Sequence, residues 1–249
     1  MPTIAFLTLD QVGHYVMDDD LAVGPLEAHG WSVSFVPWRR PDVDWRAYDA
    51  VVIRSPWDYQ DDVEEFLNVL ARIERCGTPV LNPRSLVAWN VRKTYLRDLA
   101  ARGVPIVPTI WRDRLTPGSL RAVYDAVGTP DIVVKPVVSA SAIGAYRLDA
   151  AGVGTRAAEV EAYFADRALM AQPFLTAVLD EGEFSAVAFD GVVSHTLLKT
   201  PKAGDFRSQE EYDSFVRRID PEPALSAAVA TALEALGDPP LYARVDLVR

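Results

Sequence analysis

The chain has 249 residues, of which 49% are hydrophobic and 24% are charged. This composition is typical of a soluble globular protein with one elaborate domain or two smaller ones. Lys and Arg number 25 and Asp and Glu number 35, so the formal net charge is -10. That balance argues against a general binder of nucleic acid or of anionic membranes, and any phosphate site must be local.

The sequence has one cysteine and shows no pattern typical of a signal peptide or a membrane span. The single cysteine, Cys76, has no partner for an internal disulfide, and we expect it to pack in the core. The first residues, MPTIAFLTLDQ, lack a basic stretch and a long apolar run, so they do not read as a signal peptide. No later run approaches the roughly 18 apolar residues of a membrane span. We expect a cytoplasmic protein with no nucleic-acid and no membrane partner.

Strands and helices alternate in the first third of the chain. The patterns predict strands at Thr3–Leu9, Trp31–Val36, Ala50–Ile53 and Pro79–Leu81, and helices at Asp18–His29 and Val63–Arg75. This alternation predicts a doubly wound parallel sheet with binding loops at the carboxyl ends of its strands. The segments Leu9–Tyr15 and Arg54–Tyr59 are therefore candidate substrate loops.

The pattern changes after Asn82. We expect helices at Val91–Arg102 and Arg156–Ala165, and strands at Ile132–Pro136, Tyr146–Leu148, Leu169–Phe174, Glu183–Phe189 and Val192–Lys199. An Asp-Gly turn joins the last two strands into a hairpin, and Tyr146–Leu148 is the expected hairpin partner of Ile132–Pro136. The fold class is thus α/β with an α+β second half.

The segment VVKPVVSASAIGAY, residues 133–146, combines a lysine on a buried strand with a loop of small residues. Lys135 either reaches the surface along its alkyl chain or serves an anion. The loop Ser139–Gly144 favours the anion, because small residues let the backbone approach it and supply amide and hydroxyl donors. The P-loop pattern GxxxxGK[ST] is absent, so the segment is not a P-loop.

The motif RSPWDY, residues 54–59, is the best substrate candidate in the first third. Arg54 can hold a carboxylate and Trp57 can wall a pocket, with Ser55 and Asp58 beside them. His14 is a substrate contact, a proton carrier, or a loop histidine without a role. Several other polar and aromatic residues read as structural: His195, Asp18–Asp20 at the start of a helix, and Trp38, Trp45 and Trp111.

Several features follow one another in a diagnostic order: WN before Lys93, VVKP with Lys135, the small-residue loop, MAQPFL, EGEFS, KTPKAGDFRSQ and YARVDLV. In this order the chain resembles the ATP-grasp superfamily. It is similar to the glutathione synthetase and ribosomal-protein-modifying ligase branch, and most to actinobacterial ligases typified by the O-ureido-serine cyclo-ligase of D-cycloserine biosynthesis. The resemblance implies a pre-ATP-grasp domain at 1–82 and two α+β subdomains clasping ATP, at 83–171 and 172–249.

The resemblance also implies roles for individual residues. Lys93 and Lys135 would hold the ATP phosphates, and Glu181 or Glu183 would face the ribose, unless these acids are only solvated charges. The phosphate loop would use Ser139, Ser141 and Gly144, and the hinge at the adenine edge would use Gln172, Pro173, Phe174 and Leu175.

Two further residues complete the implied site. Arg207 would face the transferred phosphoryl group as a catalytic residue together with Lys135, because a guanidinium binds two oxygens and keeps its charge. Asp246 would be the first magnesium-binding carboxylate. In related proteins a second acidic strand, of the form ELE followed by IEP, supplies the remaining ligands beyond the position of Arg249. We therefore expect the C-terminal subdomain to be incomplete at its end and a longer polypeptide to carry that strand.

The implied function is that of a ligase using ATP and Mg²⁺ to activate a small amino-acid-like carboxylate as an acyl phosphate in secondary metabolism, as in antibiotic biosynthesis. The product would contain a new carbon–nitrogen bond, made by cyclisation or by joining to a second molecule. Two alternatives stay open: a ligase adding amino acids to a peptide or protein, and an ATP-binding protein impaired in catalysis. Homo-oligomers are common among such enzymes, and we expect one here.

Overall fold

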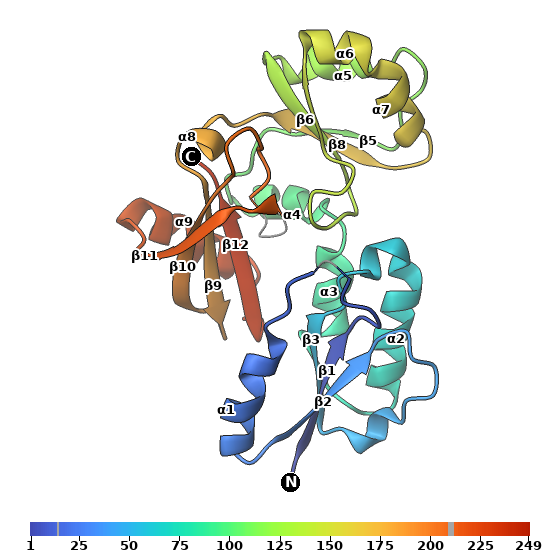
Figure 1. Ribbon diagram of the computed structural model, residues 1–249, viewed down its shortest axis with the longest axis vertical. Helices are drawn as coiled ribbons and strands as arrows, with labels where there is room; N and C mark the ends of the chain where they lie inside the picture. Colours follow the sequence, from blue (N-terminus) through green and yellow to red (C-terminus); the bar gives the residue numbers. More distant parts are fainter. Residues whose placement is uncertain (14, 209–211) are drawn as a thin grey trace. The chain divides into compact units, whose positions relative to one another are not determined.

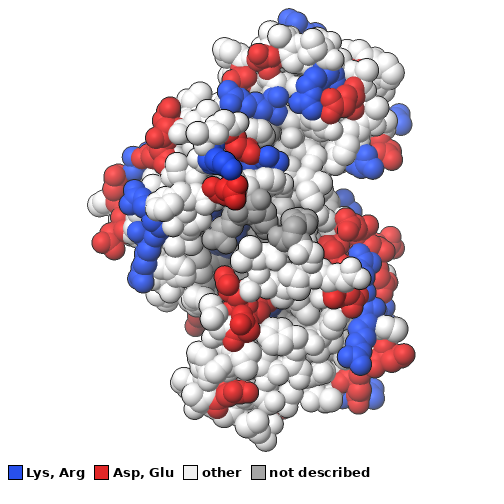
Figure 2. Space-filling view, viewed as in Figure 1, with Lys and Arg blue, Asp and Glu red and all other residues white. Residues whose placement is uncertain are grey.

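The structure, a computed structural model, describes residues 1–13, 15–208 and 212–249. The chain forms two compact units. Unit 1 contains Met1–Val91 with Phe189–Val192 and Pro239–Ala243, and unit 2 contains Arg92–Ala188, Val193–Asp238 and Arg244–Arg249. The three-domain division stays a prediction. On the face drawn in Figure 2, the acidic and basic side chains of the described residues are interspersed.

Unit 1 is built on a parallel four-stranded sheet with the order β2-β1-β3-β4 (Figure 1). Its strands are β1 Thr3–Thr8, β2 Ser32–Pro37, β3 Ala50–Ser55 and β4 Val80–Leu81. Its helices are α1 Val23–Ala28, α2 Val63–Arg75 and α3 Arg84–Asn90, with short 3-10 turns η1 Asp19–Ala22, η2 Trp45–Ala47 and η3 Tyr59–Asp61. The doubly wound arrangement predicted for this part of the chain is thus observed.

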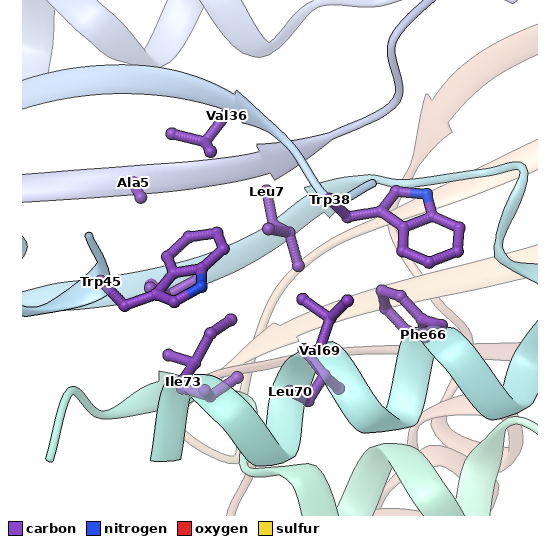
Figure 3. Packing of buried hydrophobic residues seen from close by; sticks show 11 residues of the cluster. Ala5, Leu7, Val36, Trp38, Trp45, Phe66, Val69, Leu70 and Ile73 are labelled. Atoms are coloured by element: carbon purple, nitrogen blue, oxygen red, sulfur yellow. The ribbon is translucent and has the colours of Figure 1, made fainter. Parts of the chain in front are cut away.

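Helices cover both faces of this sheet because residues along β1 alternate in direction. Ile4 and Phe6 pack with Leu26 of α1, whereas Ala5 and Leu7 pack with α2 on the other face. Figure 3 shows the second core, in which α2 presents Phe66, Val69, Leu70 and Ile73 to the sheet while Trp38 and Trp45 lie toward its two ends. Trp38, which the sequence assigned to either core or surface packing, is fully buried.

Unit 2 contains two further sheets. The first is antiparallel, has the order β5-β8-β6-β7, and consists of β5 Ile110–Arg112, β6 Asp131–Pro136, β7 Tyr146–Asp149 and β8 Leu169–Pro173. The second has the order β11-β10-β9-β12 and consists of β9 Glu183–Phe189, β10 Val192–Thr200, β11 Phe215–Ile219 and β12 Tyr242–Leu247. The helices are α4 Tyr95–Ala101, α5 Leu120–Val127, α6 Ala150–Thr155, α7 Ala157–Tyr163, α8 Ala177–Asp180 and α9 Pro223–Glu234.

Each sheet of unit 2 has one face covered by helices and one face that carries polar residues. In the first sheet, Ile132 and Val134 pack against helices α5 to α7, so the alternate residue Lys135 points the other way. In the second sheet, Phe184 and Leu198 pack against Leu225 of α9. The neighbouring positions Glu183, Ser185 and Lys199 therefore lie on the opposite face. The polar faces of both sheets carry the predicted ATP residues.

Two predicted helices were wrong in detail. The stretch Asp18–His29 begins as the 3-10 turn η1, and Asp19 turns into the interior instead of facing the helix end. The stretch Val91–Arg102 is helical only over α4, because residues 91–94 form a non-helical connection between the end of α3 at Asn90 and the start of α4 at Tyr95. The sequence did not predict helices α3, α5, α6, α8 and α9 or strands β5 and β11.

Among the described residues, no helix is both long enough and apolar enough to cross a membrane.

Candidate active site

Lys93 lies in the break between α3 and α4, where its backbone is tied to the strand that carries Lys135. Its N–H donates to the carbonyl oxygen of Val137 at 2.9 Å, and its ammonium donates to the carbonyl and the hydroxyl oxygen of Ser139 at 2.7 and 3.0 Å. Both acceptors are neutral. Burial, and then the nearby charge of Lys135, lower the pKa of Lys93 from 10.5 to about 8. An ammonium group destabilised by burial and by a neighbouring ammonium group favours the binding of an anion.

Lys135 lies on β6, and the pairing of β6 with β7 on one side and β8 on the other holds its backbone in place. Burial lowers the pKa of Lys135, and the carboxylate of Glu183 opposes that shift by favouring the charged form. Lys135 is therefore a half-buried lysine near the carboxylate of Glu183, and not an exposed surface lysine.

The loop after β6 carries three residues with positive φ: Ser141 at 47°, Ala142 at 55° and Gly144 at 71°. A Cβ on Gly144 would lie 2.3 Å from the hydroxyl oxygen of Tyr163, so only glycine fits there. The hydroxyl of Tyr212 donates to the carbonyl oxygen of Ser141 at 2.9 Å. Both ends of this loop therefore contact other parts of unit 2: Ser139 accepts from Lys93, and Gly144 lies close to the ring of Tyr163.

The predicted hinge occupies the end of β8. Gln172 is buried and its amide donates to the hydroxyl oxygen of Thr109 at 2.9 Å. Phe174 donates its N–H to the carbonyl oxygen of Asp131, and its ring lies under the guanidinium of Arg147 at 3.8 Å and at the edge of Phe206 at 6.0 Å. Pro173 and Leu175 are half-buried beside these two residues.

The two candidate ribose acids have different surroundings. Glu183 accepts a hydrogen bond from Lys199 at 3.2 Å, and its negative charge raises the pKa of Lys135. Glu181 instead forms an ion pair with Arg249 at 2.8 Å and lines a hollow of about 650 Å³ on the α9 side of the second sheet. The structure therefore places Glu183, and not Glu181, with the lysines.

Asp246 joins the polar face of the second sheet through three neighbours. It accepts from Ser185 at 2.5 Å and from two nitrogens of Arg244 at 2.8 and 2.9 Å, and it lies 3.8 Å from Lys199. Partial burial works against its ionisation, but Arg244, Lys199 and the hydrogen bonds outweigh that effect and lower the pKa of Asp246. The carboxylate is therefore ionised at neutral pH and surrounded by cations.

Arg207 is paired inside its own loop. Its guanidinium binds both oxygens of Asp205, at 2.6 Å for the shortest contact, and lies 3.6 Å from the ring centre of Tyr212. The hydrogen bonds from Arg207 and from the N–H of Phe206 lower the pKa of Asp205 to about 2. The three residues that follow Ser208 lie outside the described part of the chain.

Sequence reasoning missed Lys199, Arg244, Asp205 and Tyr212. Two signals were available. Arg244 and Asp246 are two apart on a strand and so share a face. The chain has only four lysines, and three of them, Lys93, Lys135 and Lys199, belong to this site.

The RSPWDY residues lie in unit 1 at the end of β3. Arg54 pairs with Asp19 at 2.7 Å, and the Ser55 hydroxyl is fully buried and donates to Asp19 at 2.6 Å. Asp58 accepts from the indole of Trp38 at 2.6 Å and from Arg39 at 3.1 Å. The rings of Trp57 and Tyr15 lie 5.2 Å apart.

Three of the four residues, Arg54, Ser55 and Asp58, thus have internal polar partners, and only Arg54 keeps a third of its side chain exposed. The substrate role of the group stays a prediction. His14 lies outside the described residues.

The residues fit ATP more fully than they fit a metal ion. Two half-buried lysines, a close-approaching loop and an aromatic hinge suit a nucleotide. Within the described residues, no group of three His, Cys, Asp or Glu side chains could hold a metal ion. Because Mg²⁺ is commonly bound by one or two carboxylates plus substrate phosphates, Asp246 fits as a single protein ligand.

Comparisons with known proteins agree with this geometry. The chain is 34% identical over 245 residues to the cycloserine biosynthesis protein DcsG of Streptomyces lavendulae, covering 88% of this chain and 77% of that protein. Residues 4–82 match the family model of the N-terminal domain of D-cycloserine synthetase DcsG. The crystal structure of D-cycloserine synthetase DcsG matches with a TM-score of 0.81 and 29% identity, over 99% of this chain and 86% of that one.

More distant structures share the fold. D-alanine–D-alanine ligase from Bacillus anthracis matches with a TM-score of 0.71 and 16% identity, over 100% of this chain and 83% of that one. A RimK-domain ATP-grasp protein from Sphaerobacter thermophilus matches with a TM-score of 0.70 and 18% identity, over 99% of this chain and 86% of that one. The ATP-grasp ligase PsnB has been solved with Mg and ADP.

Fold and relatives together define the class: the protein is an ATP-grasp ligase, an enzyme that forms carbon–nitrogen bonds. Within that class, the chain belongs to the DcsG family. The predicted ATP-grasp fold, enzyme class and family resemblance are thereby confirmed, and the use of ATP and Mg²⁺ is supported at the level of the family.

Proposed function

We propose that this enzyme activates the carboxylate of a small amino-acid-like molecule as an acyl phosphate and closes or joins it through nitrogen, and that O-ureido-D-serine is its substrate. The observation that carries the proposal is the pair Lys93 and Lys135, both half-buried, in which the charge of Lys135 adds to burial in lowering the pKa of Lys93. A triphosphate relieves this repulsion. The family membership supports a cycloserine-like product.

In the first step, a carboxylate oxygen of the substrate attacks the γ-phosphorus of ATP, and the bond to the β-phosphate oxygen breaks so that ADP leaves. Lys93 and Lys135 neutralise the phosphate oxygens, and the backbone of Ser139–Gly144 covers them. Arg207 binds the transferred phosphoryl oxygens after exchanging Asp205 for them. Glu183 accepts from the ribose hydroxyls, and Phe174 packs at the adenine with Gln172, Pro173 and Leu175.

In the second step, a nitrogen of the substrate attacks the acyl carbon, its proton is lost to solvent, and the carbon–oxygen bond to phosphate breaks. No side-chain nucleophile is required. Mg²⁺, when bound through Asp246, neutralises charge on the phosphates. Ser185 and Arg244 orient the Asp246 carboxylate for that role.

Substrate binding is assigned to unit 1. Arg54 binds the carboxylate and Trp57 forms an apolar wall, with Ser55 and Asp58 supporting them and His14 as a further candidate contact. We also propose that the enzyme is cytoplasmic and acts on small molecules. We propose that it forms a homo-oligomer, and sedimentation velocity tests that oligomeric state. A peptide or protein acceptor ranks second, because an acidic surface repels an acidic acceptor.

The test measures the release of ADP and phosphate from ATP in the presence of magnesium. Each assay contains one candidate substrate from a panel of D- and L-amino acids that includes O-ureido-D-serine and D-serine. Lys135→Met is the inactive variant, and Lys202→Met, an exposed lysine in unit 2 that pairs with Asp213, is its matched control. Release that depends on O-ureido-D-serine and is lost only in Lys135→Met supports the proposal. Thermal stabilisation by ATP without turnover of any acid would instead support an ATP-binding protein or a ligase for a larger acceptor.

A further inference from the structure

Asp19 is a buried carboxylate in unit 1 with a role that neither the motif order nor the family comparison assigns. It is 6% exposed and lies in the 3-10 turn η1. Its Oδ1 accepts from Nε of Arg54 at 2.9 Å and lies 2.7 Å from Nη2, while its Oδ2 accepts from the Ser55 hydroxyl at 2.6 Å. Both carboxylate oxygens are therefore committed to the RSPWDY motif.

A second hydrogen bond extends this arrangement to the neighbouring strand. The hydroxyl oxygens of Thr8 and Ser55 are 2.9 Å apart, and since the Ser55 proton goes to Asp19, Thr8 is the donor. Thr8 ends β1, Ser55 ends β3, and the two residues are register partners. The sheet extends from β1 to β2 in one direction and to β3 in the other. Open α/β sheets bind ligands at the carboxyl ends of strands around such a reversal.

Arg54 is restrained on two sides. Asp19 holds the edge formed by Nε and Nη2, and the ring of Phe6 lies under the guanidinium at 5.6 Å from its centre. The side chain nevertheless keeps 34% of its accessible surface. The contacts to Asp19 do not use Nη1, so the edge formed by Nη1 and the second proton of Nη2 points away from Asp19. That edge suits one further carboxylate in bidentate geometry.

A stability role alone explains this arrangement poorly. Removing a carboxylate from water is unfavourable, and the attraction within a buried ion pair returns little more than that cost. What such a pair reliably gives is a fixed orientation, because a guanidinium chelated at one edge cannot rotate among the rotamers of a long side chain.

We propose that Asp19 is a positioning residue that fixes Arg54 for binding the carboxylate of the substrate, with Ser55 and Thr8 holding Asp19 in turn. The inference rests on the proposed function, since it requires a carboxylate substrate at Arg54. Asp19 itself touches no reacting atom. The buried Ser55, predicted to contact the substrate, acts on this view through Asp19.

The experiment compares the KM for O-ureido-D-serine and the KM for ATP in the wild type and in Arg54→Ala, Asp19→Asn and Ser55→Ala. A misplaced binding group typically costs about 10- to 100-fold. We expect the KM for O-ureido-D-serine to rise by about that factor in Asp19→Asn and by a smaller factor in Ser55→Ala, with the KM for ATP within about twofold. Glu65→Gln removes an arginine-paired carboxylate from α2 of the same unit and is the matched control, with both constants unchanged.

Chemical rescue separates positioning from simple structural support. Guanidinium ion, added below denaturing concentration, should restore part of the lost activity of Arg54→Ala because Asp19 can hold the small ion in place. It should restore nothing in the double variant Arg54→Ala with Asp19→Asn. If Asp19→Asn does not fold, Ser55→Ala and the rescue of Arg54→Ala with Asp19 intact decide the matter.

The outcomes are distinct. A wild type that turns over no acid refutes the proposed function, and the inference with it, before any variant is compared. An active wild type whose KM for O-ureido-D-serine rises in Arg54→Ala but stays unchanged in folded Asp19→Asn and Ser55→Ala refutes the inference alone. An unchanged KM in Arg54→Ala also refutes it, because the substrate carboxylate would then lie elsewhere.

Discussion

Replacing Lys93 by methionine should make the protein more stable while removing its response to ATP. The pKa of Lys93 falls from 10.5 to about 8 through burial and the charge of Lys135. One pKa unit corresponds to about 1.4 kcal/mol, so keeping this lysine protonated at pH 7 costs the folded protein about 3 kcal/mol. Methionine has a similar length and no charge to desolvate.

Part of that gain is offset. The ammonium of Lys93 donates two hydrogen bonds to Ser139, which methionine cannot make, and each contributes about 1 kcal/mol. We therefore expect Lys93→Met to raise the free energy of unfolding by about 1 kcal/mol net, a shift of about 2–4 °C in Tm for a chain of this size. The same substitution leaves the phosphates with one lysine, so ATP should no longer raise the Tm.

Urea unfolding at pH 7 and thermal melts with and without ATP measure the two effects. Lys202→Met is the control, since Lys202 is exposed and pairs only with Asp213 among its described contacts. It should change stability by less than about 0.5 kcal/mol and keep the ATP response. A Lys93→Met protein that is less stable than the wild type by more than about 1 kcal/mol, or that still responds fully to ATP, would show that Lys93 is a structural residue.

Three further outcomes are expected. The KM for ATP should rise about tenfold between pH 7 and pH 9, because a phosphate binds only protonated Lys93 and the pKa of that group is about 8; a flat profile in steady-state assays contradicts this assignment. Gly144→Ala should raise the KM for ATP and lower the Tm, since its Cβ would meet Tyr163 and its φ is 71°; kinetics and melts identical to those of the wild type would contradict the loop assignment. Leu70→Ala, in the α2 core, should lose about 2–5 kcal/mol in urea unfolding with an unchanged KM for ATP in the folded enzyme, and a loss below about 1 kcal/mol would show that this core is loosely packed.

Local patterns predicted the elements whose signals lie within a few residues. Helix α2 begins and ends where its apolar period and its acidic first turn predict, at Val63 and Arg75. The Asp-Gly hairpin formed as well, with both turn residues at positive φ. The break before α4 could not be predicted in this way. No glycine or proline marks it, and the N–H of Lys93 bonds to Val137, which lies far along the chain.

Asp19 illustrates the same limit for a single side chain. Three consecutive aspartates before a helix favour an interaction with the helix end, and nothing in the local sequence distinguishes the middle one. Its partners Arg54 and Ser55 lie 35 and 36 residues away. The family resemblance placed the ATP residues because the order of motifs survives across the superfamily. It placed no partner for Arg54, since that pairing depends on the fold of unit 1.

The choice between lysine and arginine carries information in this chain. Of its 25 basic residues, only four are lysines, so arginine is the ordinary surface cation here. Arginine cannot lose its proton, and at a buried position without a carboxylate its charge would stay and cost the fold throughout. The pKa of a lysine can fall on burial, as that of Lys93 does, and a bound anion raises it again. Lys199 differs because Glu183 and Asp246 accompany it. The two lysines with the least carboxylate support are therefore the two that the arrival of ATP would stabilise most.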